Sequence, residues 1–471
     1  MSINMDKLLT RRQWLKTAGT GLGMIGMAGL LAQDKTASAY KTKTGQYQPK
    51  AKYLIHIMFN GGLSHVDSFD PKPLLEKYDG RPLPKKLKTE FATGGAYASR
   101  FKFTKYGKSG IPVSSMFPHL GQHADDLCVI RSMHTDVPNH EPGLLMMNTG
   151  DNILPRPSMG SWINYGLGSE NQNLPGFIVM SPGGYPVSGA ANWRSAFLPG
   201  IYQGTYIDTN NTRIDKLIEN IRNRKVTSKI QRRQIDLLSE LNAGHLAKNK
   251  GEVEFDSRMK SYELAYKMQM EATDAFDLSK EPEYIQEMYG NTPQCRQLLM
   301  ARRLVERGVR CVQLFHAPGN AWDHHFNIDA QHARLAAQVS QGIGALITDL
   351  KQRGLLDETL ILIGGEFGRT PVVELPRNGG KIDKNFKPGR DHNNHGFSCA
   401  LLGGGVKGGH IHGSTDEFGF EAVEDKVHVH DLHATILKLM GIDHEELTFR
   451  FSGRDFRLTD VEGYVVNDII A

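Results

Sequence analysis

The chain has 471 residues and a net charge of +5, with 39% hydrophobic and 23% charged residues, which is typical of a globular protein of one large or two domains. Residues 1–39 carry +3 of that charge and residues 40–471 only +2. So weak a positive charge gives no reason to expect a nucleic acid as partner. No stretch after residue 39 approaches the roughly 18 consecutive apolar residues of a membrane span, so we expect no transmembrane anchor in the mature protein.

The first 39 residues have the pattern of an export signal. Arg11 and Arg12 precede a glycine-containing apolar stretch over 17–31, and the small-residue triplet 37–39 follows. This order of basic, apolar and cleavage segments is typical of a signal read by the twin-arginine export machinery. We therefore expect residues 1–39 to be removed and the protein to be exported, either periplasmic or at the cell surface. The alternative is an amphipathic N-terminal helix that carries two arginines by chance.

The rest of the chain alternates strand and helix patterns. Apolar runs typical of strands covered on both faces occur at 53–59, 127–131, 176–180, 310–315, 359–363 and 398–402. Helical patterns at 292–308 and 330–353 each lead into one of these runs. The alternation predicts an α/β fold with a doubly wound, mostly parallel sheet. Residues 212–290 have helical patterns and no strand pattern, so we expect a helical insertion in the domain that spans 40–471.

Polar loops rich in Asp, Glu, His and Arg adjoin five of the predicted strands, at 60–71, 139–150, 316–325, 365–371 and 389–395. Ligands of open parallel sheets bind just beyond the carboxyl ends of the strands. Five such loops therefore predict one shared site, although each loop residue taken alone is a common turn former or helix cap.

The residue types in these loops suit a metal ion and an anion. Asp323 and His325 lie in one turn and could bind the same ion, with His392 completing the set. Imidazole and carboxylate ligands suit zinc, iron or manganese. Arg369 and Arg390 could hold an anionic group such as sulfate or phosphate.

Longer motifs resemble a known family: GGLSHVDSFDPKP, NHEPGLLMMNTG, WDHHFN, GEFGRTP, GRDHNNHGFSCALLGGGVKGG and DLHATILKLMGID. They are similar to motifs of the exported bacterial family called domain of unknown function 1501, which belongs with the alkaline phosphatase superfamily and its sulfatases. The resemblance implies an alkaline-phosphatase-like core, a divalent metal ion (zinc, manganese or calcium) and a sulfate or phosphate ester as substrate, on a small molecule or a polysaccharide.

The chain departs from the superfamily pattern at three positions. Asn60 stands where an Asp ligand follows the first strand, and 366–367 reads Glu-Phe where an Asp-His pair is usual. The nucleophile, which comes nine places before a Thr-Gly pair, corresponds to His140. If the protein is a hydrolase, the attacking group would then be His140 or a water activated by a single metal ion.

The resemblance and the loop pattern together give an expected site. The residues expected by role are Asp323, His325, His392 and Glu366 for the metal, His140, Asp67 and Glu366 for catalysis, and Arg369, Arg390 and Asn60 for the substrate. The first hypothesis is an exported sulfatase- or phosphatase-like metallohydrolase. The alternative is a non-catalytic periplasmic or surface binding protein on a degenerate phosphatase fold, which the altered nucleophile position favours.

Overall fold

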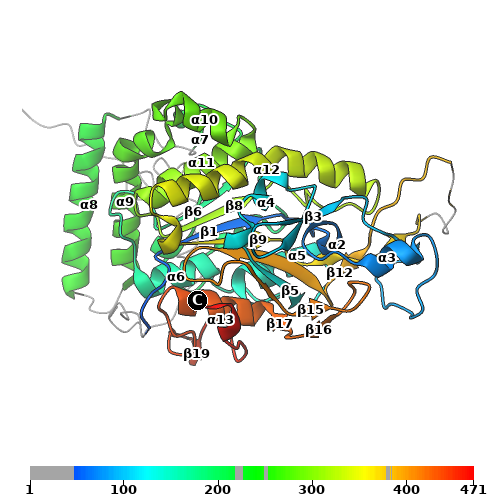
Figure 1. Cartoon of the computed structure of the whole chain (residues 1–471). Coiled ribbons are helices and arrows are strands. Elements are labelled where there is room, and N and C mark those ends of the chain that lie inside the picture. Colours follow the sequence, from blue (N-terminus) through cyan, green and yellow to red (C-terminus); the bar gives the residue numbers. More distant parts are fainter. Residues whose placement is uncertain (1–46, 218–225, 249–252, 378–381, 383) are drawn as a thin grey trace, which may run out of the picture.

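The computed structural model describes residues 47–217, 226–248, 253–377, 382 and 384–471 (Figure 1). The expected signal segment 1–39 lies outside these ranges. A central nine-stranded sheet consists of β1 (Tyr53–Met58), β5 (Cys128–His134), β6 (Phe177–Ser181), β7 (Thr205–Asp208), β8 (Cys311–Phe315), β9 (Thr359–Gly364), β13 (Phe397–Leu402), β14 (His410–His412) and β17 (Val427–His428). All six predicted strand regions are strands of this sheet.

The strand order is β14-β5-β13-β9-β1-β8-β6-β7, and β17 also pairs with β5. Every neighbouring pair is parallel except those of β13, which runs antiparallel to both β5 and β9. This confirms the predicted α/β class with a mostly parallel sheet. The antiparallel strand has a consequence for the site, because the start of β13 lies at the same edge as the ends of its neighbours.

Three central strands end at the same level. Met58, the last residue of β1, pairs with Phe315 of β8 on one side and with Gly364 of β9 on the other. The loops that follow these strands therefore leave the sheet side by side. They carry Asn60, the 316–325 segment and Glu366.

Helices cover both faces of the sheet (Figure 1). One face carries α4 (Pro118–Gly121), α11 (Pro293–Glu306) and α12 (Ile328–Gln352), and the other carries α5 (His140–Thr149), α6 (Met159–Leu167) and α13 (Val429–Leu439). Strand β1 shows the division, because Ile55 and Ile57 belong to one core cluster and Leu54 and Met58 to the other. Burial of these alternating apolar side chains on both faces stabilises the sheet by removing apolar surface from water.

The region between β7 and α11 is helical where it is described, with α7 (Ile214–Leu217), α8 (Ser228–Lys248), α9 (Val253–Phe276) and α10 (Glu283–Tyr289). A buried ion-pair network attaches it to the core: Arg302 of α11 bridges Glu281 and Asp349 of α12. The outer helix α8 packs on α9 at the edge of the molecule (Figure 1). None of the helices in the described ranges is long and apolar enough to cross a membrane.

Candidate metal centre

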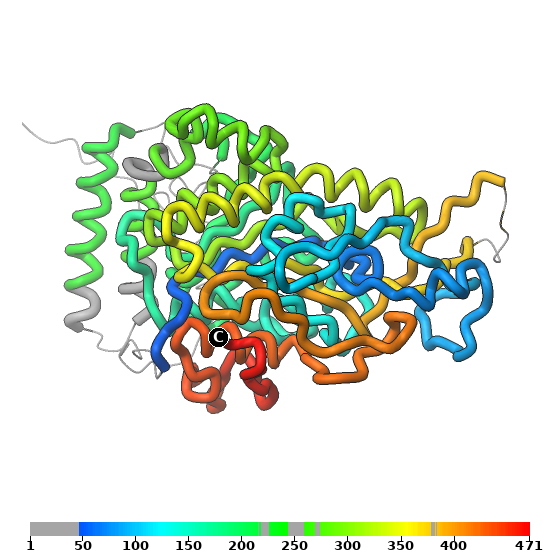
Figure 2. Tube along the Cα trace, in the orientation of Figure 1, coloured from blue at the N-terminus to red at the C-terminus, as the bar shows by residue number. Residues whose placement is uncertain are grey.

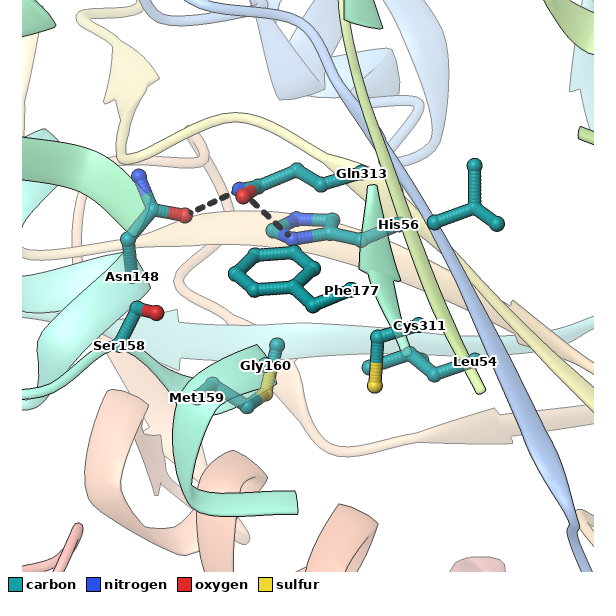
Figure 3. Close-up of a pocket in the computed structure, with 10 residues that line it drawn as sticks. Leu54, His56, Asn148, Ser158, Met159, Gly160, Phe177, Cys311 and Gln313 are labelled. Atoms are coloured by element: carbon teal, nitrogen blue, oxygen red, sulfur yellow. Dashed lines mark hydrogen bonds between the residues drawn. The ribbon is translucent and has the colours of Figure 1, made fainter. Parts of the chain in front are cut away.

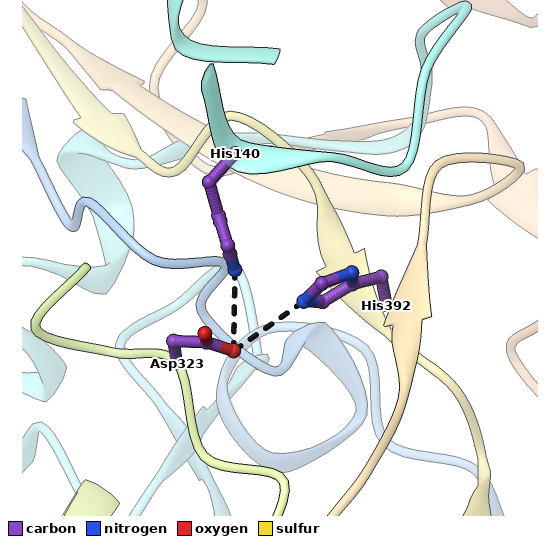
Figure 4. Close-up of side chains that lie close together, drawn as sticks. All are labelled: His140, Asp323 and His392. Carbon is purple, nitrogen blue, oxygen red and sulfur yellow. Dashed lines mark hydrogen bonds and ion pairs between the residues drawn. The ribbon is translucent and has the colours of Figure 1, made fainter. Parts of the chain in front are cut away.

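Three histidines and one aspartate from three loops meet beyond the ends of the strands. Figure 4 shows His140, Asp323 and His392 of this group. Asp323 and His325 lie in the turn between β8 and α12, and His140 is the first residue of α5. His392 lies in β12 (His392–Asn393), which pairs with β10 (Gly368–Arg369). Since β12 leads directly into the antiparallel β13, its reversed direction brings His392 to this edge.

The three imidazoles point at a single oxygen. The distances from Nε2 to Oδ1 of Asp323 are 3.1 Å for His140, 3.0 Å for His325 and 3.3 Å for His392. The rings also pack edge to face, with centroids 4.5 Å apart for His140 and His392 and 4.7 Å apart for His325 and His392. We call His140, His325 and His392 the histidine triad.

Each ring of the triad has a second carboxylate at its other nitrogen. The Nδ1 pairs are His140 with Glu366 at 2.7 Å, His392 with Glu90 at 2.9 Å, and His325 with Glu374. We call Glu90, Glu366 and Glu374 the outer carboxylates. A histidine that binds a metal commonly donates its other N–H to a carboxylate in this way, which fixes the tautomer and the ring orientation.

The arrangement places too many nitrogens around one oxygen. Oδ1 of Asp323 has the three Nε2 atoms and one Arg369 nitrogen, at 2.6 Å, as neighbours. A carboxylate oxygen has two lone pairs, and a neutral imidazole that donates from Nδ1 presents a lone pair at Nε2. Nε2 of His140 is buried and makes no hydrogen bond despite its closeness to Asp323. The donor atoms of His140, Asp323 and His392 all lie within 4.8 Å of one another. A cation among them would relieve the lone-pair repulsion, so these three residues fit a divalent metal ion, with His325 beside them.

Charge and burial act in opposite directions on these groups. Burial opposes ionisation of Asp323, but its histidine and arginine neighbours outweigh burial and hold the pKa of this carboxyl far below its usual range. Burial acts to lower the pKa of each triad histidine, because it disfavours the charged ring. Contacts with carboxylates prevail for His140 and His325, whose pKa values are raised. For His392, burial together with the charge of Arg369 lowers the pKa to about 3, so its ring is neutral at pH 7.

Arg369 is a fully buried clamp on the loops of this site. It donates hydrogen bonds to the carbonyl oxygens of Gly61, Gly62 and Arg390 and to Asp323. Its side chain has 0% exposure, so every direction around the guanidinium is already occupied by protein. These bonds use four of the five N–H groups, so Arg369 fixes Asp323 and its surroundings, and the buried guanidinium is not open to an anion from solvent.

Three other expected residues, Arg390, Asp67 and Asn60, are buried near these loops without contacting Asp323. Arg390 and Asp67 form a buried bidentate pair at 2.9 and 3.1 Å. The Asn60 amide donates to the carbonyl oxygens of Ala317 and Gly319 at 2.9 and 2.6 Å, and its oxygen accepts a bond from the backbone of the same loop. These side chains hold loops together and do not reach Asp323.

Glu366 connects the triad to the first loop. Its Oε1 accepts a bond from the backbone N–H of Gly61 at 2.9 Å as well as contacting His140. Gly61 has φ +112°, and a Cβ on it would lie 2.6 Å from the backbone nitrogen of Asp323. A glycine is required here because the backbone approaches the Asp323 turn too closely for any side chain.

Helix α5, which carries His140, is anchored from below by buried polar side chains around a small cavity (Figure 3). Asn148, near the end of this helix, accepts a hydrogen bond from Gln313 of β8 at 2.6 Å, and Gln313 lies 3.4 Å from Nδ1 of His56 in β1. Asn148 also donates to Asn192 at 2.9 Å. Satisfied buried networks of this kind fix geometry, so they hold α5 and its first residue against the sheet.

Two carboxylates that contact the histidine triad, Glu90 and Glu374, are absent from the residues expected from sequence. Glu90 lies in the lysine-rich segment before β2 (Thr93–Ala96), and Glu374 ends β11 (Val372–Glu374), which pairs with β2. The general preference of metal-binding histidines for a carboxylate partner was the one available signal. It indicates that partners exist but not which of the many acidic residues they are.

Several solved structures are similar to the chain. The lipoteichoic acid synthase LtaP from Listeria monocytogenes has a TM-score of 0.35 at 9% identity, over 85% of this chain and 76% of that one. The PsFucS1 sulfatase from Pseudoalteromonas sp. has a TM-score of 0.36 at 13% identity, over 93% and 73%. Alkaline phosphatase from the Antarctic bacterium TAB5 has a TM-score of 0.32 at 10% identity, over 83% and 98%. No curated protein matches the chain.

One family profile matches nearly the whole chain. It covers residues 51–470 and so includes Asp323, the histidine triad and the outer carboxylates. The family resemblance of the sequence motifs is thereby confirmed. The chain belongs to the family described as protein of unknown function (DUF1501).

Proposed function

We propose that this protein is an exported, metal-dependent hydrolase of sulfate or phosphate esters, with the metal held by Asp323 and the histidine triad. The observation that carries the proposal is the double constraint on each ring. Every Nε2 faces the same Asp323 oxygen, and every Nδ1 faces an outer carboxylate. A purely structural histidine needs one hydrogen-bond partner. In a metal site, each ring directs one nitrogen toward the metal, and a carboxylate at the other nitrogen fixes the orientation of the ring.

The donor set favours particular ions. Three imidazole nitrogens with one carboxylate suit zinc or manganese, whereas calcium takes oxygen ligands. Such an ion would act as a Lewis acid toward an ester oxygen. The protein's own part is to orient the rings through the outer carboxylates, and to hold Asp323 through Arg369.

This proposal gives His140 a ligand role rather than the role of nucleophile. Its Nδ1 is 2.7 Å from Glu366 and its Nε2 faces Asp323, so neither nitrogen is free to attack an ester. We likewise give Asp67, Arg390 and Asn60 positioning roles, because their polar atoms are engaged inside the protein.

A second candidate function is a non-catalytic binding protein on the same fold. It is favoured by the state of Arg369 and Arg390, which are 0% exposed and have protein partners around their guanidinium groups. Neither guanidinium group is therefore exposed to bind an ester anion. A metal centre without an adjacent anion clamp would suit ligand capture as well as cleavage.

Metal content and turnover test both candidates. Protein purified from a host with an intact twin-arginine system would be analysed for bound metal and assayed on aryl sulfate and aryl phosphate esters. We expect about one equivalent of a transition metal, and we expect Asp323→Ala to lose both metal and turnover. Asp455→Ala is the matched control, because Asp455 is exposed and forms its ion pair with Arg450 on a surface hairpin.

The outcomes separate the two functions. Bound metal with no turnover of any ester favours the binding protein. Metal-free wild-type protein, or unchanged turnover in Asp323→Ala, contradicts the metallohydrolase.

A further inference from the structure

Two lysine-rich segments border the metal centre, and nothing in the metal site explains their charge. The first, residues 80–92, reads GRPLPKKLKTEFA and carries a net charge of +3. The second, residues 384–389, reads KNFKPG and carries +2. The remainder of residues 40–471 carries −3. Within residues 40–471, positive charge is therefore concentrated at these two segments.

Both segments are attached to the site by direct contacts. Glu90 of the first segment contacts His392, and the backbone N–H of Phe91 donates to Asp391 at 2.8 Å. In the second, the carbonyl oxygen of Lys387 accepts a hydrogen bond from Asn327, two residues after His325. Figure 2 shows the tube of both segments extending beyond the sheet on the same side of the molecule.

Four lysines of these segments are available for a ligand. Lys86, Lys88, Lys384 and Lys387 are exposed, and none forms an ion pair with a carboxylate of the described residues. Lys85 differs from them, because it pairs with Asp416. We call the four lysines the basic rim. Like charges gathered on a surface repel one another, so their concentration costs stability unless an anion binds there.

We infer that the basic rim binds an anionic polysaccharide, a chain with repeated sulfate or phosphate esters, and presents one of its esters to the metal centre. This inference rests on the proposed function for the ester that is cleaved. The rim itself needs only the repeated charge of the polymer. Asp323 and His325 are each 23% exposed, whereas His140 and His392 are 7% exposed, so a pendant group on a long chain could reach the centre from the side of Asp323 and His325.

The four lysines of the basic rim offer charge, and the aromatic ring of the first segment is not open to stacking. Proteins that bind single-stranded nucleic acid use open aromatic faces on which bases stack. Phe91 on the first segment is already covered, since the guanidinium of Arg377 lies 3.8 Å from the ring centroid and His325 packs edge-on at 5.7 Å. Phe326, next to His325, is 55% exposed, so the choice of a polysaccharide over a nucleic acid rests on the sulfate or phosphate ester of the proposed function.

The test measures binding of fluorescently labelled dextran sulfate to the purified full-length protein at low and at physiological salt. The quadruple variant Lys86→Ala, Lys88→Ala, Lys384→Ala and Lys387→Ala removes the rim. Its matched control replaces four exposed lysines elsewhere, namely Lys105, Lys108, Lys229 and Lys407. We expect the rim variant to lose about tenfold or more in affinity, from four surface charge contacts, and to show a weaker salt dependence. The control should stay within twofold.

Two further arms distinguish this inference from the proposed function and from other polymers. Binding measured with excess EDTA should persist, because the rim does not depend on the metal; loss of ester turnover alone would then count only against the metallohydrolase. Equal losses in the rim and control variants, equal binding of uncharged dextran, or tighter binding of single-stranded DNA of matched charge would each overturn the inference.

Discussion

Replacing Glu374 by Gln tests whether the outer carboxylates serve a metal. Glu374 is 3% exposed, and its Oε2 contacts Nδ1 of His325. Its other neighbour, Arg377, is 3.4 Å away and 60% exposed, so that ion pair contributes little. Gln keeps the size of the side chain but removes the charge that orients the ring. Loss of such a partner typically weakens metal binding about 10- to 100-fold, which is about 1–3 kcal/mol of binding free energy.

The assay is competition for zinc between the protein and a chromophoric chelator. The three outer carboxylates should rank by burial, with the largest loss for Glu366→Gln at 0% exposure and the smallest for Glu90→Gln at 28%. Glu421→Gln is the control, because this carboxylate is exposed and its ion pair is with Lys426, away from the histidine triad. If Glu374→Gln binds zinc within twofold of the wild type, the second partners of the triad have no metal-related role.

Three other predictions concern stability and export. Asp67→Ala leaves Arg390 buried without its partner, which should cost about 3–5 kcal/mol of unfolding free energy in urea titrations; a loss below 1 kcal/mol would contradict a tight buried pair. Burial lowers the pKa of His433 to about 3, so the unfolded chain takes up this proton first as pH falls below 6.5. This histidine alone should cost about 3 kcal/mol of stability by pH 4.5, so His433→Gln should lose that much less stability than the wild type over this range, while other buried histidines such as His56, with a pKa of about 4, still contribute; equal losses in both would contradict the assignment. Changing the 11–12 arginine pair to lysines should leave unprocessed protein in the cytoplasm by immunoblot, and normal processing would argue against twin-arginine export.

The sheet was predictable because buried parallel strands leave a strong signal. Runs such as YLIHIM and TLILIG consist almost entirely of apolar residues, which fit a strand buried on both faces, and each forms such a strand. The direction of β13 was not predictable. Whether a strand runs parallel or antiparallel depends on where the chain re-enters the sheet. The described part of the 365–396 connection contains no helix that would have signalled a crossover.

The site was predictable in its location more than in its roles. Asp323, His325 and His392 stood out because ligand-type residues cluster after strands. The roles of Arg369 and Arg390 could not be separated from sequence, since an arginine that clamps backbone carbonyls and one that grips a substrate have the same residue type. Burial decides between these roles, and burial of a polar loop residue depends on contacts hundreds of residues away.

The first lysine-rich segment, residues 80–92, connects the proposed metal centre with the basic rim. Glu90 orients His392 from behind, and Lys86 and Lys88 extend from the same short stretch of chain into solvent. The pairing of β2 with β11 fixes this stretch beside Glu374, which orients His325. One local structure therefore positions two of the three metal-directed rings and also carries half of the basic rim. A polymer held by the rim would for that reason lie in a fixed relation to the metal centre, because the lysines and the ring-orienting carboxylates share a backbone.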